Sequence, residues 1–94
     1  MPKDHPTGES GLYQAILSLK TPEDVYHFLQ DVCSYSELSA MEQRFDIAEM
    51  LLDKQIYVDI MEKTGASSAI ISRVNRVLAN EGSFLRRVLA EPVK

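Results

Sequence analysis

The sequence is poor in the residues that build covalent or metal-held structure. Its 94 residues contain one cysteine, Cys33, so no disulfide can form within the chain. No C-x-x-C or H-x-x-x-H pair occurs, and His5 and His27 are far apart in the sequence. We therefore expect no zinc site. Cys33 is interpreted as a small buried hydrophobic residue, and His27 as a solvated one.

Long apolar runs are missing as well. No stretch approaches the roughly 18 consecutive apolar residues of a membrane span. The polar start, MPKDHPTGES, does not resemble a secretory signal. The acidic residues are expected singly on helix faces, without an inward-facing pair, and no nucleophile is paired with a base. We expect a cytoplasmic protein with no catalytic activity, no cofactor and no membrane contact.

What the sequence does have is the pattern of a small helical domain. Hydrophobic residues make up 45% of the chain, and they recur three and four positions apart, without strand-like alternation. A chain of this size buries only part of its surface, so such domains often complete their core by dimerising. The pattern predicts an all-α fold of about six helices, with a flexible arm over residues 1–9 and a single domain over residues 10–91.

Capping signals predict where the first three helices begin. Ser10 precedes a helix to about Leu19, and Thr21 with Pro22 precedes one to about Val32. Residues 34–37 form a capping box before the longest helix, which ends near Asp53, although Ser39 with Glu42 is a competing start. The positions predicted to face inward are Leu12, Ile16, Leu19, Val25, Phe28, Leu29, Val32, Leu38, Met41, Phe45, Ile47, Ala48, Met50, Leu51 and Leu52.

The end of the chain predicts one more short helix. Ser83 is its cap, residues 84–90 form it, and Pro92 ends it. Asn80 or Gly82 is expected in the left-handed conformation before it. The predicted inward residues are Phe84, Leu85, Val88 and Leu89, and the predicted outward residues are Arg86 and Arg87.

Residues 57–78 predict a helix-turn-helix. Tyr57, Ile60 and Met61 give one apolar stripe, and Gly65 can adopt the positive φ that ends a helix. Ser67 can then cap a second helix. Its buried stripe is Ile71, Val74 and Leu78, and two short helices joined through glycine cross steeply. Ile60, Ile71 and Val74 are expected to fill the core at that crossing.

The opposite face of the second helix carries hydroxyls and arginines. Ser67, Ser68 and Ser72 are small enough to approach base edges, and Arg73 and Arg76 can bind guanine or phosphate. The alternative is that this is the solvated face of an ordinary amphipathic helix. The Gly65 turn and the flanking apolar spacing favour DNA binding.

Charge is unevenly distributed along the chain. The net charge is −4, but residues 1–53 carry three basic and ten acidic groups, whereas residues 54–76 carry four basic and two acidic groups. The basic groups of this second segment include Lys54 and Lys63. The positive charge is therefore concentrated at the motif, where we expect modest, salt-sensitive affinity for DNA.

The run TGASSAIISRVNRVL resembles the Trp-repressor-like YerC/YecD family of bacterial proteins. The segments LYQAILSLK, VYHFLQDVC and ELSAMEQRFDIAEML are similar to the same family in register, over about residues 10–90. The resemblance implies an intertwined helical homodimer with two recognition helices about one DNA turn, roughly 34 Å, apart. Its DNA contacts would fall on Ser67, Ser68, Ala69 and Ser72. At the phosphate-holding positions Tyr57 could donate a hydrogen bond, with Lys54 and Lys63 as substitutes.

The tryptophan site of the Trp repressor superfamily is altered in this sequence. One of its arginines corresponds to Arg73, but the other falls on Gln43, with Arg44 one residue along. The glycine that leaves room for the indole is Val74 here. The resemblance therefore implies no tryptophan corepressor, and any other small effector is unknown.

Two functions are compatible with these patterns. The first is a dimeric transcriptional regulator, expected to be a repressor, that binds double-stranded operator DNA through residues 67–76. The second is a helical protein-interaction module that keeps the fold but has lost DNA binding. A continuous positive surface around the motif would favour the first. Acids that interrupt it, above all Asp59 and Glu62, would favour the second.

Overall fold

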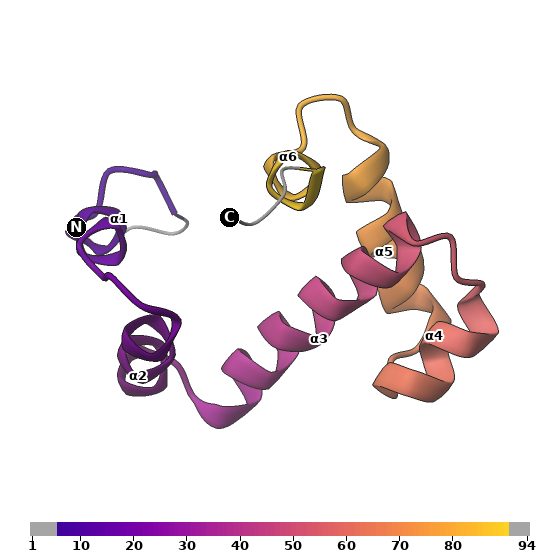
Figure 1. The fold of residues 1–94 in the computed structure, drawn as a ribbon, viewed down its shortest axis with the longest axis horizontal. Coiled ribbons are helices and arrows are strands. Elements are labelled where there is room, and N and C mark those ends of the chain that lie inside the picture. Colours follow the sequence, from indigo (N-terminus) through magenta and orange to yellow (C-terminus); the bar gives the residue numbers. More distant parts are fainter. Residues whose placement is uncertain (1–5, 91–94) are drawn as a thin grey trace. The chain divides into compact units, whose positions relative to one another are not determined.

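The computed structural model describes residues 6–90, and within this range it contains helices and no strands (Figure 1). The prediction of an all-α fold with about six helices is confirmed. Residues 1–5 of the predicted arm and Pro92, the predicted end of the last helix, lie outside the described residues. The helices are α1 (Gly11–Leu17), α2 (Pro22–Val32), α3 (Tyr35–Leu52), α4 (Tyr57–Thr64), α5 (Ser68–Ala79) and α6 (Phe84–Ala90).

The chain divides between Leu38 and Ser39 into two compact units, so that α3 begins in the first unit and continues into the second. None of the described helices has the length and hydropathy that a membrane span requires.

Predicted caps open the helices of the first unit. Ser10 Oγ accepts from the N–H of Leu12 at 3.1 Å, and Thr21 Oγ1 accepts from that of Asp24 at 3.1 Å. The capping box also forms: Glu37 Oε1 accepts from the N–H of Ser34 at 2.8 Å, and Ser34 Oγ accepts from that of Glu37 at 3.1 Å. α3 therefore begins at this box, and the competing start at Ser39 is not used. The backbone and side-chain hydrogen bonds from Ser34 lower the pKa of Glu37 below its ordinary value.

α3 ends in a Schellman motif with a lysine where glycine is usual. The N–H of Gln55 donates to Met50 O and that of Lys54 to Leu51 O, both at 3.0 Å. Lys54 has φ 65°, the left-handed region that a side chain enters at a cost of about 1 kcal/mol. The sequence did not predict this turn.

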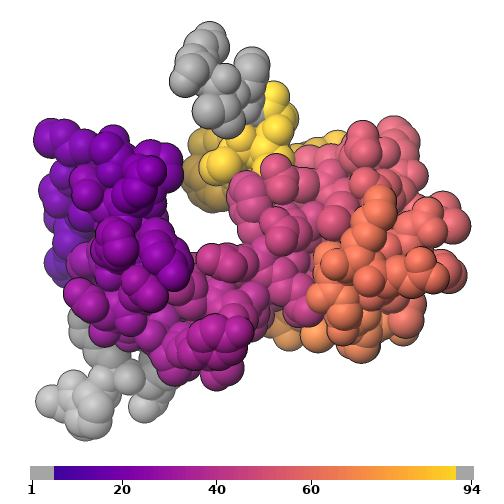
Figure 2. All heavy atoms as spheres, turned by 60° about the horizontal axis from the view of Figure 1, so that its bottom comes forward, coloured from indigo at the N-terminus to yellow at the C-terminus, as the bar shows by residue number. Residues whose placement is uncertain are grey.

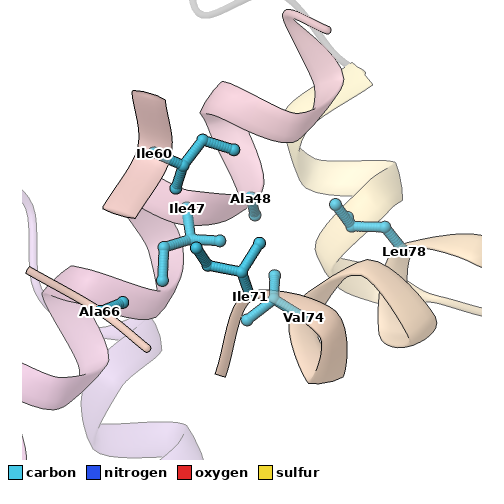
Figure 3. Close-up of a cluster of buried hydrophobic side chains, with 7 residues drawn as sticks. All are labelled: Ile47, Ala48, Ile60, Ala66, Ile71, Val74 and Leu78. Atoms are coloured by element: carbon cyan, nitrogen blue, oxygen red, sulfur yellow. The ribbon is translucent and has the colours of Figure 1, made fainter. Parts of the chain in front are cut away.

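The hydrophobic core lies in the second unit. It joins α3, α4 and α5 through side chains that are 0–4% exposed, and Figure 3 shows those of α3, α4 and α5 pointing toward one another. Met50, Leu51, Tyr57, Leu85 and Leu89 pack around it. Burial of the predicted residues Ile60, Ile71 and Val74 at the crossing is confirmed. The buried residues are Ile47, Ala48, Ile60, Ala66, Ile71, Val74 and Leu78.

Several predicted inward positions are exposed within one chain. Only one side of α6 faces the core, through Leu85 and Leu89, so Phe84 is 70% and Val88 58% exposed. Cys33, expected to be buried, is half-buried. Further residues predicted to face inward but exposed are Leu12, Ile16, Val32, Met41, Phe45 and Leu52.

Two details at the ends of helices were predicted wrongly. α1 ends at Leu17 rather than Leu19, and Ser18 Oγ donates back to Ala15 O. Neither Asn80 nor Gly82 is left-handed. Asn80 is extended, and its side chain makes the reversal instead by accepting from the N–H of Gly82 at 2.9 Å. Ser83 caps α6 as predicted, accepting from Arg86 N at 3.1 Å.

Candidate DNA interface

The predicted helix-turn-helix is present as α4, a turn at Gly65, and α5. Gly65 has φ 75°, and its N–H donates to Met61 O at 2.8 Å, which closes the left-handed end of α4. Ser67 then caps α5 by accepting from the N–H of Ile70 at 3.2 Å. In Figure 1 both helices lie beside the C-terminal half of α3. In the space-filling view of Figure 2 the atoms of α3, magenta to pink, meet those of the motif without a visible gap.

Thr64 stabilises the turn through three hydrogen bonds. Its hydroxyl donates to Ile60 O at 2.7 Å and accepts from the N–H of Ala66 at 3.2 Å. Its carbonyl accepts from Nε2 of Gln43, on α3, at 3.0 Å. Sequence reasoning missed this contact because the partners are 21 residues apart and no local pattern links them.

The exposed face of α5 carries most of the predicted DNA-binding residues. Ala69, Ser72, Arg73 and Arg76 are spaced three and four apart, so they form one strip along the helix. This strip lies on the side away from the buried positions. Ser67 and Ser68 are exposed at its N-terminal end. We call these residues the α5 strip: Ser67, Ser68, Ala69, Ser72, Arg73 and Arg76.

The other predicted residues belong to α4 and to the loop before it. Lys54 is exposed in the left-handed turn after α3. Lys63 is exposed, and its Nζ donates to Gln55 Oε1 at 3.0 Å, while Gln55 Nε2 donates to Asp53 Oδ2 at 3.3 Å. Tyr57 is half-buried against the core, which leaves part of the ring accessible.

The two helices of the motif differ in charge. α5 contains no acidic residue, so its strip offers hydroxyls and guanidinium groups alone. α4 exposes Asp59 and Glu62 together with Lys63. An acid-free helix face suits the polyanionic DNA surface, and a mixed one contributes little to it.

The residues at the altered tryptophan site have other roles in this chain. Val74 is 4% exposed within the core, as expected. The amide of Gln43 is bonded to Thr64, and Arg73 points to solvent on the α5 strip. A hollow of about 160 Å³ lies between α3, α5 and α6, smaller than the roughly 300–1,000 Å³ of typical ligand pockets. Arg86 is exposed, as predicted, and its guanidinium also lines this hollow and donates to Leu78 O at 3.3 Å.

Within residues 6–90 no group of three or more His, Cys, Asp or Glu side chains is arranged to hold a metal ion.

Comparison with known proteins finds a matching family and similar proteins. The sequence profile of the family described as "Trp repressor protein" matches residues 10–92. The uncharacterised protein YerC of Bacillus subtilis (strain 168) is 41% identical over 83 residues, which are 88% of this chain and 79% of YerC. A crystal structure of a TrpR-like protein from Eubacterium eligens ATCC 27750 superposes with a TM-score of 0.79 at 49% identity. The alignment covers 84% of this chain and 81% of that one.

Proposed function

The chain belongs to the Trp repressor protein family, and from that premise we propose that it is a dimeric transcriptional regulator. It binds double-stranded operator DNA in the cytoplasm through the α5 strip, acts as a repressor, and needs no tryptophan as corepressor. Lys54, Lys63 and Tyr57 contribute phosphate contacts beside the strip. The family assignment supports a helical regulator, and the α5 strip, the first unit and the core residue Val74 support the finer points.

The α5 strip is the observation that carries the proposal. Its last four residues, three and four positions apart, face solvent, and the opposite side of the same helix is anchored by Ile71, Val74 and Leu78. A rigidly anchored helix with small residues at its start and arginines beyond can enter the major groove. Small side chains permit close approach, and each arginine can bind guanine or phosphate.

Dimerisation is supported by the first unit. α1 and α2 contain no buried residue, although both have amphipathic sequences and formed caps. Tyr35 and Leu17 are 89% and 77% exposed. Helices with so much uncovered apolar surface are unstable in water, so a second copy is the partner that we propose.

The absence of a tryptophan requirement is supported by Val74 and Gln43. Val74 fills space that the resemblance assigns to the indole, because its side chain is packed within the core. Gln43 is occupied by its bond to Thr64. The helix-turn-helix is therefore held by its own packing, and no bound ligand is needed to complete it.

The protein-interaction module remains the second candidate. Two features favour it: Asp59 and Glu62 are exposed on α4, and the whole chain has a net charge of −4. Electrostatic repulsion between these acids and the phosphates of DNA would weaken DNA binding. The two candidates differ in whether the folded dimer enriches a DNA sequence.

Selection of bound duplexes from a random DNA pool tests the proposal. The full chain is used at about 50 mM salt, since affinity based on phosphate contacts falls steeply as salt rises. One arm contains L-tryptophan and the other does not. We expect the same palindromic site to be enriched in both arms. Enrichment only with tryptophan would contradict the role given to Val74, and no enrichment by a folded dimer would favour the interaction module.

Arg73→Ala tests the α5 strip at one residue. Loss of an arginine contact to a base or phosphate should weaken binding to the selected duplex by about 1–3 kcal/mol. The free energy of unfolding should change little, because Arg73 is exposed. Arg44→Ala is the matched control, since it removes the same charge from an exposed position on α3. Equal affinities for the two variants in a fluorescence titration would exclude Arg73 as a contact.

A further inference from the structure

One side chain fastens the turn of the helix-turn-helix to α3. The side-chain amide of Gln43 donates to the carbonyl of Thr64 at 3.0 Å, and the contact is partly buried. The donor must be the amide nitrogen, since the partner is a carbonyl oxygen. This carbonyl is among the last four of α4, which have no partner inside their own helix. Gln43 therefore satisfies a helix end from a different element.

The position of Gln43 places this bond at the border of the core. Gln43 lies one turn before Ile47, on the same face of α3, and Ile47 packs in the cluster with Ile60 and Ala66. On the other side of the bond, Thr64 contacts Ile60 and Ala66 through its hydroxyl. The bond thus joins α3 to Thr64, the first of the three residues (64–66) that connect α4 to the cap of α5.

The core anchors α5 through Ile71, Val74 and Leu78. Hydrophobic attraction is itself non-directional, so a hydrogen bond at the turn adds an angular constraint that apolar burial lacks. A hydrogen bond depends strongly on distance and angle. The Gln43–Thr64 bond is therefore the contact that selects one orientation of the turn from those that the core tolerates.

We infer that Gln43 is a positioning residue that sets the direction in which α5 leaves the turn, and with it the aim of the α5 strip. Gln43 need not touch DNA. It acts through Thr64 and the turn, and it gives the motif a fixed orientation without a bound effector. This inference rests on the proposed function, because the aim of α5 matters for activity only if the helix contacts DNA.

Three variants of the full chain test the inference. Gln43→Met keeps the length of the side chain and removes the donor. Gln43→Lys keeps a donor at similar reach. Gln30→Met makes the same chemical change as the first variant at an exposed position on α2, and serves as the control. If Gln43→Met does not fold, Gln43→Asn takes its place, because it stays polar but is one methylene too short to span the bond.

Amide hydrogen exchange is the first readout and requires no DNA. In Gln43→Met we expect exchange at Gly65 and Ala66 to become about ten-fold faster, with amides in the middle of α5 unchanged. Gln43→Lys should restore slow exchange at both positions, and Gln30→Met should match the wild type. Unchanged exchange at the turn, or equal acceleration throughout α4 and α5, would overturn the inference, since the second result describes a merely structural role.

Affinity for the duplex enriched by the wild-type chain is the second readout. It is measured well below the unfolding temperature, so that all variants are folded. We expect Gln43→Met to bind about ten-fold more weakly and Gln30→Met to bind as the wild type does. The lysine variant is judged on exchange alone, because its added charge changes DNA affinity directly. Wild-type affinity in folded Gln43→Met would overturn the inference.

Failure of the proposed function gives a different result. In that case the wild-type chain enriches no duplex, and the exchange measurement alone decides the role of Gln43. Localised acceleration at Gly65 and Ala66 would support its hold on the turn, and its absence would overturn it.

Discussion

The two units of the chain differ in how their helices are held. All the side chains found buried in the described residues belong to the second unit, where they join α3, α4 and α5. The first unit has well-formed caps on α1, α2 and α3 but no buried residue among residues 6–38. Caps decide where a helix begins, whereas burial supplies most of the stability of short helices. The second unit therefore has its own core, whereas the helices of the first unit bury no side chain, which supports the proposal that a second copy covers them.

This contrast supports the different tasks that we propose for the two units. The second unit carries the helix-turn-helix on a core of its own, which suits a head that presents α5 to DNA. The first unit exposes large apolar side chains such as Leu17 and Tyr35, which suits association with a second copy.

Removing side-chain volume from the core of the second unit should have the largest effect. Ile71→Ala replaces a fully buried side chain and should lower the free energy of unfolding by about 2–5 kcal/mol. Ile70→Ala, one residue earlier on α5, alters a side chain that is 36% exposed and should cost much less. Urea denaturation at one fixed protein concentration compares them. Similar losses for the two variants would contradict the core described for this unit.

Charge placed on the first unit should break the dimer. Val32→Asp puts a carboxylate on α2 where we propose that a second copy packs, and an unpaired buried charge is strongly unfavourable. We expect the dimer to dissociate at least about 100-fold more readily, which is about 2.7 kcal/mol. Sedimentation velocity over a range of concentrations measures this.

Val58→Asp is the control for that experiment. Val58 lies on α4 in the second unit and is 60% exposed, close to the 57% of Val32. The same substitution there should leave the dimer intact. If Val58→Asp dissociates the protein and Val32→Asp does not, then the tasks assigned to the two units are reversed.

The features that could be predicted from the sequence depend on interactions between residues close together along the chain. The helix caps could be predicted because each cap bonds to an amide two or three residues away. These caps are Ser10, Thr21, Ser34, Ser67 and Ser83. Gly65 was identified because its positive φ is a local requirement of the turn. Ile71, Val74 and Leu78 followed from helical periodicity alone.

Features that depend on distant partners could not be predicted. The bond from Gln43 to Thr64 spans 21 residues. Phe84 and Val88 have the apolar pattern of buried residues, but which side of α6 packs on the core is decided by the tertiary structure. The left-handed Lys54 was missed for another reason, since lysine gives no signal for a conformation that favours glycine. The residues of the α5 strip were predicted from the sequence pattern and the family resemblance together.

A smaller effect is expected at the end of α3. Lys54→Gly should raise the free energy of unfolding by about 0.5–1 kcal/mol, because glycine adopts a positive φ without steric cost. Lys54→Ala removes the same charge but keeps the strain, and should give no gain. Thermal denaturation compares their stabilities. The two variants should lose the same DNA affinity if Lys54 acts through its charge, and unequal losses would mean that the turn geometry contributes.

The smallest effect is expected at the capping box of the first unit. The pKa of Glu37 is lowered in the folded state, so its carboxylate stabilises the fold above the ordinary pKa of 4.5, and this contribution is lost as pH falls through the lowered value. Glu37→Gln keeps the acceptor without the charge. Its stability should fall below that of the wild type at pH 7, and the difference should disappear in acid. A difference that is the same at pH 3 and pH 7 would contradict this account.

The most direct test of the whole account is a footprint of the wild-type chain on its selected duplex. A dimer held by the first unit, with two α5 strips in the major groove, predicts two-fold symmetric protection. The protected half-sites should be centred about one helical turn, 10–10.5 base pairs, apart. Protection should appear without tryptophan. A single unpaired half-site, or no protection by a folded dimer, would contradict the account.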